Sequence, residues 1–432
     1  MLSRMMKPLS SLLLFVFSVL MLNAQTVPSP ESYLGYKVGT QFTRHHQIVG
    51  YFNTIAQAKP DMVKIMPYGK TNEGRDLMVA VIGLPENIAK LEAIRKHNNG
   101  LVDGSVTDMN QPTIVWLSYN VHGNEPSSSE AALLTLFALV DPANTNTKEW
   151  LKNTIVMIDP CINPDGRDRY VNWYNNAVGT SYNADPSSRE HMEPWPAGRS
   201  NHYNFDLNRD WAWQTQVETQ QRLKKYNEWM PQIHCDFHEQ GINNTYYFAP
   251  AAEPFHEVIT PWQRDFQTTI GKNHAKYFDA NGWFYFTKEI FDLFYPSYGD
   301  TYPMYNGAIG MTYEQAGHSS GGLTVIKNDG DTLTLKDRIA HHFTTSMSTI
   351  EMASVYQTKL ISEFQNYFTT AKNVGYSSYK SFVIKGDDTL RRNAFLNILE
   401  KNEIIYTCVA ADRTLTANGF EYNTAKENAF SI

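Results

Sequence analysis

The sequence predicts a mixed α/β fold whose mostly parallel central sheet carries helices on both faces. Residues 113–119 and 154–158 form near-continuous apolar runs, which are typical of strands buried on both sides. Residues 130–140 between them have a strongly helical pattern, and such alternation of strand and helix builds parallel sheets. With 432 residues, 42% of them hydrophobic, the chain can bury a large core.

The elements on either side extend this pattern. Residues 44–58 have helical periodicity, and the β-prone runs 63–66 and 77–82 flank a polar turn, which predicts a hairpin. Further helices are expected at 87–97, 214–229 and 332–371, with a strand at 232–237. Residues 173–204 have the composition of a long loop, and long loops over strand ends often shape a binding site.

The first residues resemble a cleaved secretory signal. Arg4 and Lys7 precede the apolar run 9–22, and a small-residue cleavage site ends at Ala24. The run is shorter than the roughly 20 residues that span a bilayer. We therefore expect a secreted or periplasmic protein with no stable membrane insertion after cleavage.

The last residues are expected to begin a second unit. After residue 375 the pattern restarts as strand 381–384, helix 390–401 and strand 404–409. So short a segment cannot bury a core of its own. The sequence thus divides into a signal (1–24), a main domain (25–375) and a partial or small appended α/β unit (376–432).

Charge and cysteine usage exclude two classes. The net charge of −7 disfavours nucleic acid as a partner. Cys161, Cys235 and Cys408 are too few and too far apart for a disulfide framework or a cysteine zinc knuckle.

A candidate metal site follows the first buried strand. His122 and Glu125 form an H-x-x-E pair in which Gly123 permits a tight turn and Pro126 suits the start of a helix. One His and one Glu suit zinc, although a polar loop with a surface salt bridge has the same spacing. His238, at the end of strand 232–237, offers a third ligand, and His234 is its competitor inside the apolar run.

Two other segments supply groups for catalysis. Glu314 ends a short apolar strand and could be the carboxylate base that activates water, or an edge-strand glutamate facing solvent. Asn208 and Arg209 place an amide beside a guanidinium, whose planar fork matches a carboxylate. A structural Arg–Asp pair is the alternative for Arg209.

With these residues in order, the chain from about Tyr33 to Ala371 resembles the carboxypeptidase A-like zinc metallocarboxypeptidases. The resemblance rests on six ordered motifs: the Glu73-Gly74-Arg75 turn, His122-x-x-Glu125, Asn163-Pro164-Asp165-Gly166, Asp206-Leu207-Asn208-Arg209, Asp236-Phe237-His238 and Tyr313-Glu314.

The resemblance implies a role for each candidate. It implies one Zn²⁺ ion held by His122, Glu125 and His238, with Glu314 as general base and acid and Asn208 with Arg209 as the clamp on the substrate's terminal carboxylate. Asp206 matches the acid that orients the first histidine ligand. For the arginine that polarises the scissile carbonyl we favour Arg199, with Arg167, Arg169 and Arg189 as rivals.

The region before Glu314 departs from the family pattern. It is shorter than usual, and for the family's mobile tyrosine we favour Tyr295, with Tyr298 as the alternative. Asp300 in the same region could face the specificity pocket and favour basic side chains, although a local hydrogen bond is the simpler interpretation.

The resemblance implies zinc-dependent hydrolysis of C-terminal peptide bonds, and the signal-like first residues imply that the enzyme is exported. Its substrate would be a peptide, or a muropeptide if the enzyme acts on γ-glutamyl or D-amino-acid linkages of the cell wall. A non-catalytic peptide-binding protein is the alternative from another class, but such proteins usually lose a ligand or the base, and here the set is complete.

Overall fold

The computed structural model describes residues 27–375, 382–383, 388–408, 416–420 and 427–431. Eight strands within them form one sheet in the order β1-β2-β4-β3-β5-β10-β6-β8. These strands are β1 (Val63–Lys70), β2 (Asp76–Ile82), β3 (Thr113–Tyr119), β4 (Thr154–Asp159), β5 (Ile233–Gln240), β6 (Tyr246–Tyr247), β8 (Tyr285–Phe286) and β10 (Ile309–Ala316).

The centre of this sheet is parallel. The four adjacent strands β4, β3, β5 and β10 run parallel to one another. The pairings of β1 with β2, β2 with β4, and β6 with β10 are antiparallel. The chain leaves β3 for β4 on one side and returns to β5 on the other. The order therefore reverses beside β3, and ligands bind at such switch points in α/β sheets.

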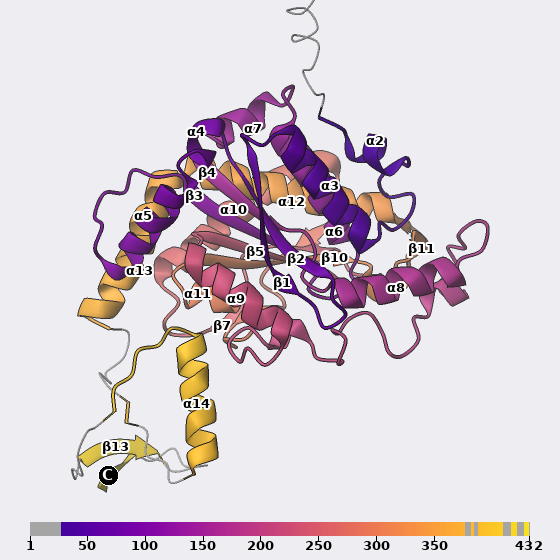
Figure 1. Cartoon of the computed structure of the whole chain (residues 1–432). Helices are drawn as coiled ribbons and strands as arrows, with labels where there is room; N and C mark the ends of the chain where they lie inside the picture. The colour runs from indigo at the N-terminus through magenta and orange to yellow at the C-terminus, as the bar shows by residue number, and fades with distance from the viewer. Residues whose placement is uncertain (1–26, 376–381, 384–387, 409–415, 421–426, 432) are drawn as a thin grey trace, which may run out of the picture.

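Helices cover both faces (Figure 1). In β3, Val115 and Leu117 pack into one cluster, and Ile114 and Trp116 into another, as the alternation of side chains requires. The first cluster includes residues of α3 (His45–Ala58), α6 (Ser127–Val140), α10 (Pro261–Asn281) and α12 (Leu335–Val355). The second includes α5 (Leu91–Asp103), α9 (Val217–Trp229), α11 (Thr301–Met304) and α13 (Gln357–Asn373). The predicted fold class is thus confirmed.

Three predicted boundaries were wrong. The stretch 332–371 begins with the short strand β12 (Thr332–Thr334) and continues as two helices, α12 and α13, divided at Tyr356. The helix expected at 87–97 is α4 (Pro85–Ile88) followed by α5. The predicted loop 173–204 begins later, because α8 (Pro164–Ala177) continues through its first residues. The remaining elements of the main body are α2 (Pro30–Leu34), α7 (Thr145–Trp150), η1 (Arg189–His191), η2 (Leu207–Arg209), η3 (His318–Ser320), β7 (Ala252–Phe255), β9 (Asp292–Leu293) and β11 (Thr324–Ile326).

The appended segment matches its prediction only in its helix. That helix is α14 (Thr389–Lys401), and a hairpin of β13 (Thr416–Phe420) and β14 (Glu427–Ser431) follows it. Residues 404–408 are not a strand, and of the strand expected at 381–384 only residues 382–383 are described, neither of them in a strand. Asn402, just after α14, hydrogen-bonds the carbonyl of Ala212 at 3.0 Å, so this end of the helix contacts the main body.

The proposed signal, residues 1–24, lies outside the described residues. Among the helices that are described, none has the length and apolar character needed to cross a bilayer. Cys161, Cys235 and Cys408 are free thiols, and none belongs to the candidate metal centre described below.

Candidate metal centre

The candidate ligands meet at the switch point. His122 and Glu125 lie in the loop between β3 and α6, and His238 lies on neighbouring β5. This loop is held tightly: a Cβ on Gly123 would lie 2.1 Å from the backbone of α8, and Asn120 donates to the carbonyls of His122 and Glu125. His238 is inside β5 rather than beyond its end, because pairing with β10 continues as far as Gln240.

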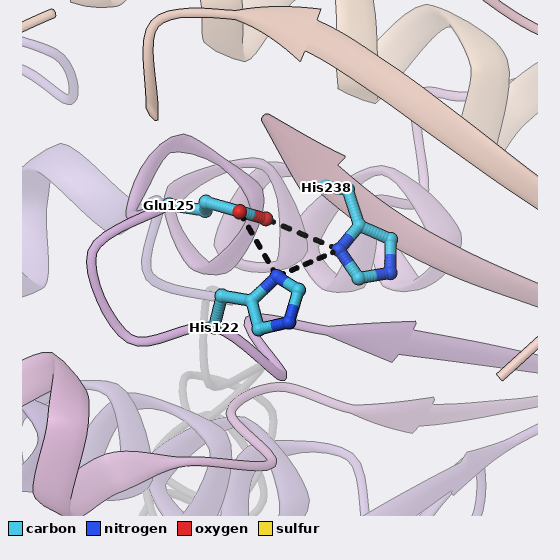
Figure 2. A group of neighbouring side chains, drawn as sticks. All are labelled: His122, Glu125 and His238. Atoms are coloured by element: carbon cyan, nitrogen blue, oxygen red, sulfur yellow. Dashed lines mark hydrogen bonds and ion pairs between the residues drawn. The ribbon is translucent and has the colours of Figure 1, made fainter. Parts of the chain in front are cut away.

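Three side chains converge on one point (Figure 2). Nδ1 of His122 lies 2.9 Å from Oε1 of Glu125, and Nδ1 of His238 lies 3.1 Å from Oε2 of the same carboxylate. The two Nδ1 atoms are 3.2 Å apart. All three side chains are buried, and they form the one group of at least three such side chains in the described part of the chain that could hold a metal ion.

The Nε2 atom of each histidine, on the side of the ring away from the cluster, contacts a carboxylate, as expected for a metal-binding histidine. Nε2 of His122 lies 2.9 Å from Oδ1 of Asp206, and Nε2 of His238 lies 2.9 Å from Oδ2 of Asp236. A carboxylate opposite Nε2 favours the tautomer with its proton there, which leaves the Nδ1 lone pair unprotonated. Two such lone pairs facing a carboxylate repel one another unless a cation lies between them. Two His and one Glu suit zinc with one position left open.

Glu314 lies in the interior of the sheet, not at a solvent-facing edge. Its strand, β10, pairs with β5 on one side and β6 on the other, and Glu314 is only 8% exposed. Burial raises the pKa of Glu314 to about 8, against the lowering effect of the charges of His238 and Arg199. A carboxyl group with its pKa near neutrality can both accept and return a proton.

Arg199 lies beside the donor cluster. Its Nη1 is 3.2 Å from Nδ1 of His122 and 3.4 Å from Oε1 of Glu125, and its Nη2 donates to Asp206 at 2.9 Å. The rivals lie elsewhere: Arg167 is fully buried against Glu130, Arg169 donates to backbone carbonyls, and Arg189 is exposed. Arg199 is the only one of the four that lines the pocket at this site.

Asn208 and Arg209 follow Asp206 in η2 and line the same pocket. Oδ1 of Asn208 accepts from the backbone N–H of Gly299 at 2.7 Å, and Arg209 lies over the ring of Tyr298 at 4.5 Å. Arg209 is 3.9 Å from Asp206, so the local Arg–Asp pair is present but loose. Since its side chain is 48% exposed, its guanidinium is accessible to a ligand.

Tyr295 is not brought to the pocket. Its hydroxyl accepts a hydrogen bond from Nε1 of Trp213 at 2.6 Å, whereas Tyr298 lines the pocket. Tyr298 therefore has the better position for a tyrosine that contacts substrate. The two rings touch, with centroids 5.0 Å apart.

The pocket has a volume of about 370 Å³. Asp300 lines it, but its carboxylate accepts from Thr301 and Thr312, each at 2.9 Å, which is the local bonding that the sequence favoured. Burial raises the pKa of Asp300. A second pocket of similar volume, near His97 and Gln357, contains no comparable group of converging ligands.

Sequence reasoning missed two neighbours of the ligands. His318, just after β10, places Nδ1 3.1 Å from Oε1 of Glu125 and has a left-handed backbone, with φ of 44°. Asp236 lies two residues before His238, and this even spacing on a strand was the available signal. His234 does not reach the site: it is buried, with Nε2 2.8 Å from Oγ of Ser118.

Comparisons with known proteins agree with this class of fold. Residues 48–266, half of the chain, match the zinc carboxypeptidase family model. Carboxypeptidase E of Caenorhabditis elegans is 27% identical over 206 residues, which are 44% of this chain and 36% of that relative. The aligned part therefore spans little more than a third of that relative's length.

Solved structures resemble the fold. Carboxypeptidase A of Helicoverpa armigera superposes with a TM-score of 0.51 at 15% identity and covers 77% of each chain. Bovine thrombin-activatable fibrinolysis inhibitor, solved with a tick carboxypeptidase inhibitor, has a TM-score of 0.50 at 13% identity, covering 75% of this chain and 99% of that chain.

The fold and the two-His, one-Glu centre define a metallopeptidase-like α/β protein. The chain belongs to the zinc carboxypeptidase family.

Proposed function

We propose that this protein is an exported zinc-dependent carboxypeptidase that removes residues from the C-terminal end of peptides. One observation carries the proposal: the donor cluster of His122, Glu125 and His238 shares a single pocket with Glu314 and Arg209. A metal centre, a base and a guanidinium for a carboxylate are the three parts that exopeptidase chemistry needs.

Substrate orientation would come from the clamp. Arg209 presents a planar fork that can bind the terminal carboxylate in a bidentate manner, and Asn208 adds an amide beside it. Holding the last carboxylate fixes the last peptide bond over the metal centre, which explains cleavage at the chain end rather than within the chain.

The proton transfers would belong to Glu314. Bound zinc would polarise the scissile carbonyl and lower the pKa of the attacking water. Glu314 accepts a proton from that water and later donates it to the leaving amine. Arg199 donates to the oxygen on which negative charge develops in the tetrahedral intermediate.

The ligands would be held by neighbouring side chains. Asp206 accepts the Nε2 proton of His122, and Arg199 in turn donates to Asp206. Such support fixes the ring orientation and the tautomer of a metal-binding histidine.

Hydrolysis of paired substrates tests the proposal. The mature protein is incubated with a peptide library in three forms: free C-terminal acids, the same peptides as C-terminal amides, and muropeptides with γ-glutamyl or D-amino-acid linkages. We expect stepwise loss of C-terminal residues from the free acids only, abolished by a zinc chelator and restored by zinc.

Preference for muropeptides would instead assign the activity to cell-wall peptides. Binding without hydrolysis of any substrate by zinc-loaded protein would make it a peptide-binding relative. Equal cleavage of acids and amides would contradict the clamp. Export is tested separately, by finding whether the extracytoplasmic protein begins near Gln25.

A further inference from the structure

Two side chains face the same ring nitrogen behind the metal centre. Nε2 of His238 lies 2.9 Å from Oδ2 of Asp236 and 3.2 Å from Nδ2 of Asn208. The carboxylate of Asp236 can only accept a hydrogen bond from this nitrogen, whereas the amide N–H of Asn208 can only donate one to it. A single ring nitrogen cannot satisfy both at once, so the tautomer of His238 decides between them.

The orientation of Asn208 is fixed independently. Its Oδ1 accepts from the backbone N–H of Gly299 at 2.7 Å, so its Nδ2 must be the atom that faces His238. An alternative amide orientation would set two donors against each other at Gly299. Asn208 is therefore a donor towards Nε2.

Asp236 has no other hydrogen-bond donor among the described residues. It is fully buried, and neither of its oxygens has an aligned hydrogen-bond partner among the described residues. A buried carboxylate without a donor is costly. Gly299 leaves the room that the carboxylate occupies, because a Cβ there would lie 2.0 Å from Oδ2 of Asp236.

We propose that Asp236 is a positioning residue that couples metal binding to capture of the substrate's terminal carboxylate. When Nδ1 of His238 binds a metal, the ring proton must lie on Nε2. Nε2–H then donates to Asp236 after a small rotation of the ring. Asn208 loses its acceptor, and its amide N–H groups become available to the substrate.

The coupling follows from the two partners that share Nε2 of His238, because a neutral ring carries one proton, on either Nδ1 or Nε2. Without metal, Nδ1 of His238 can carry the proton. Nε2 can then accept a hydrogen bond from Nδ2 of Asn208, so this amide group is not free to bind substrate. With metal, Asp236 accepts a hydrogen bond from Nε2–H, and Asn208 is released from His238. This inference rests on the proposed function only in taking Asn208 as part of the carboxylate clamp.

The first measurement is zinc affinity, by competition with a chelator. Asp236→Ala should bind zinc about 10–100-fold more weakly, the usual effect of removing a carboxylate that supports a metal-binding histidine. Asp236→Asn, which keeps an acceptor oxygen, should recover part of the loss. Asp159→Asn is the matched control, because Asp159 is an equally buried acid on β4 whose carboxylate accepts from the hydroxyl of Tyr68.

The second measurement is peptide binding without turnover. In a Glu314→Gln background, the affinities of a free-acid peptide and its C-terminal amide are compared in zinc-free and zinc-saturated protein. Zinc should increase the preference for the acid by about tenfold, the worth of a charge-assisted hydrogen bond. In the zinc-saturated Asp236→Ala protein this increase should disappear, and Asp236→Asn should restore part of it.

Each outcome decides a separate step. Unchanged zinc affinity in a folded Asp236→Ala or Asp236→Asn protein would overturn the positioning role. Weaker zinc binding with an unchanged acid-to-amide preference at saturating zinc would overturn the coupling to Asn208. Equal binding of acid and amide by the zinc-loaded parent protein would refute the clamp and so the proposed function too, whereas absence of hydrolysis alone would leave both measurements valid.

Discussion

Glu314 and His238 stand opposite each other in the parallel pairing of β10 with β5. The register of two buried strands, not a flexible loop, thus sets the separation between the proposed base and a proposed metal ligand. Rigid strands position reacting groups more precisely than loops do. The same pairing places Glu314 in a buried environment, which accounts for its raised pKa.

Glu314→Gln should abolish turnover while zinc remains bound. The amide cannot accept a proton from water, so kcat is expected to fall by about 10²–10⁴-fold, the usual contribution of a general base. Steady-state kinetics on a free-acid peptide and zinc content by atomic absorption measure the two effects. Exposed Glu253 gives the matched control Glu253→Gln, expected to be neutral. An active Glu314→Gln protein would rule out this mechanism.

The activity should rise with pH as Glu314 loses its proton. Burial raises its pKa to about 8 without metal, and a neighbouring dication favours the carboxylate, so zinc should lower that pKa. A general base works only when it is deprotonated, so kcat/KM should decline as the pH falls below the pKa of Glu314 in the zinc-loaded enzyme. Infrared difference titration against Glu314→Gln would follow the carboxyl directly. A profile that stays level between pH 5 and 8, or a pKa unmoved by zinc, would contradict this assignment.

Arg209→Met should weaken binding of the terminal carboxylate. Methionine keeps the apolar stem over Tyr298 but removes a charged hydrogen-bond donor, so KM for free-acid peptides should rise about 10–100-fold. The KM of Arg209→Lys should lie between those of wild type and Arg209→Met, since lysine keeps the charge but lacks the planar fork of the guanidinium. Peptide amides, which lack the terminal carboxylate, provide the reference substrates. An equal rise in KM for acids and amides would mean that Arg209 acts on folding or on the metal instead.

Arg199→Met should act mainly on kcat. If its guanidinium stabilises charge that develops on the scissile carbonyl, its loss should cost about 10²–10³-fold in kcat with a small change in KM. Arg169→Met is the control, because Arg169 donates only to nearby backbone carbonyls. Zinc affinity must be measured as well, since Arg199 also contacts Asp206. A pure loss of zinc binding would make Arg199 a positioning residue.

Local sequence patterns predicted the parts of the site that lie on regular elements. The apolar run 113–119 became β3 with the same bounds, and the tight turn at Gly123 brought His122 and Glu125 to its carboxyl end. His238 and Glu314 followed from strand patterns too. For these residues, strand direction alone determines the edge of the sheet at which they lie.

Residues on irregular backbone could not be predicted in this way. Tyr295 and Tyr298 lie in a segment without periodicity, so no pattern says which ring faces the pocket. His318 contacts Glu125 from a left-handed backbone, a conformation that a sequence does not reveal for a histidine. The division of 332–371 at Tyr356 was missed because the helical pattern continues across it.

Buried neutral histidines should make the fold sensitive to acid. His274 is fully buried between Ser348 and Tyr313, and burial lowers its pKa to about 3. Because the folded value lies below the unfolded value of about 6.5, its contribution to stability is present above pH 6.5 and is lost as the pH falls. Between pH 7.5 and 5 this loss should be about 2 kcal/mol for His274 alone.

Comparing Tm at the two pH values in wild type and His274→Gln measures this contribution. The variant cannot take up a proton, so its Tm should fall less on acidification, even if it is lower at pH 7.5. The chelated protein is used, so that release of zinc does not add to the acid effect. If His274→Gln loses as much stability as wild type between pH 7.5 and 5, His274 does not titrate with the folding equilibrium.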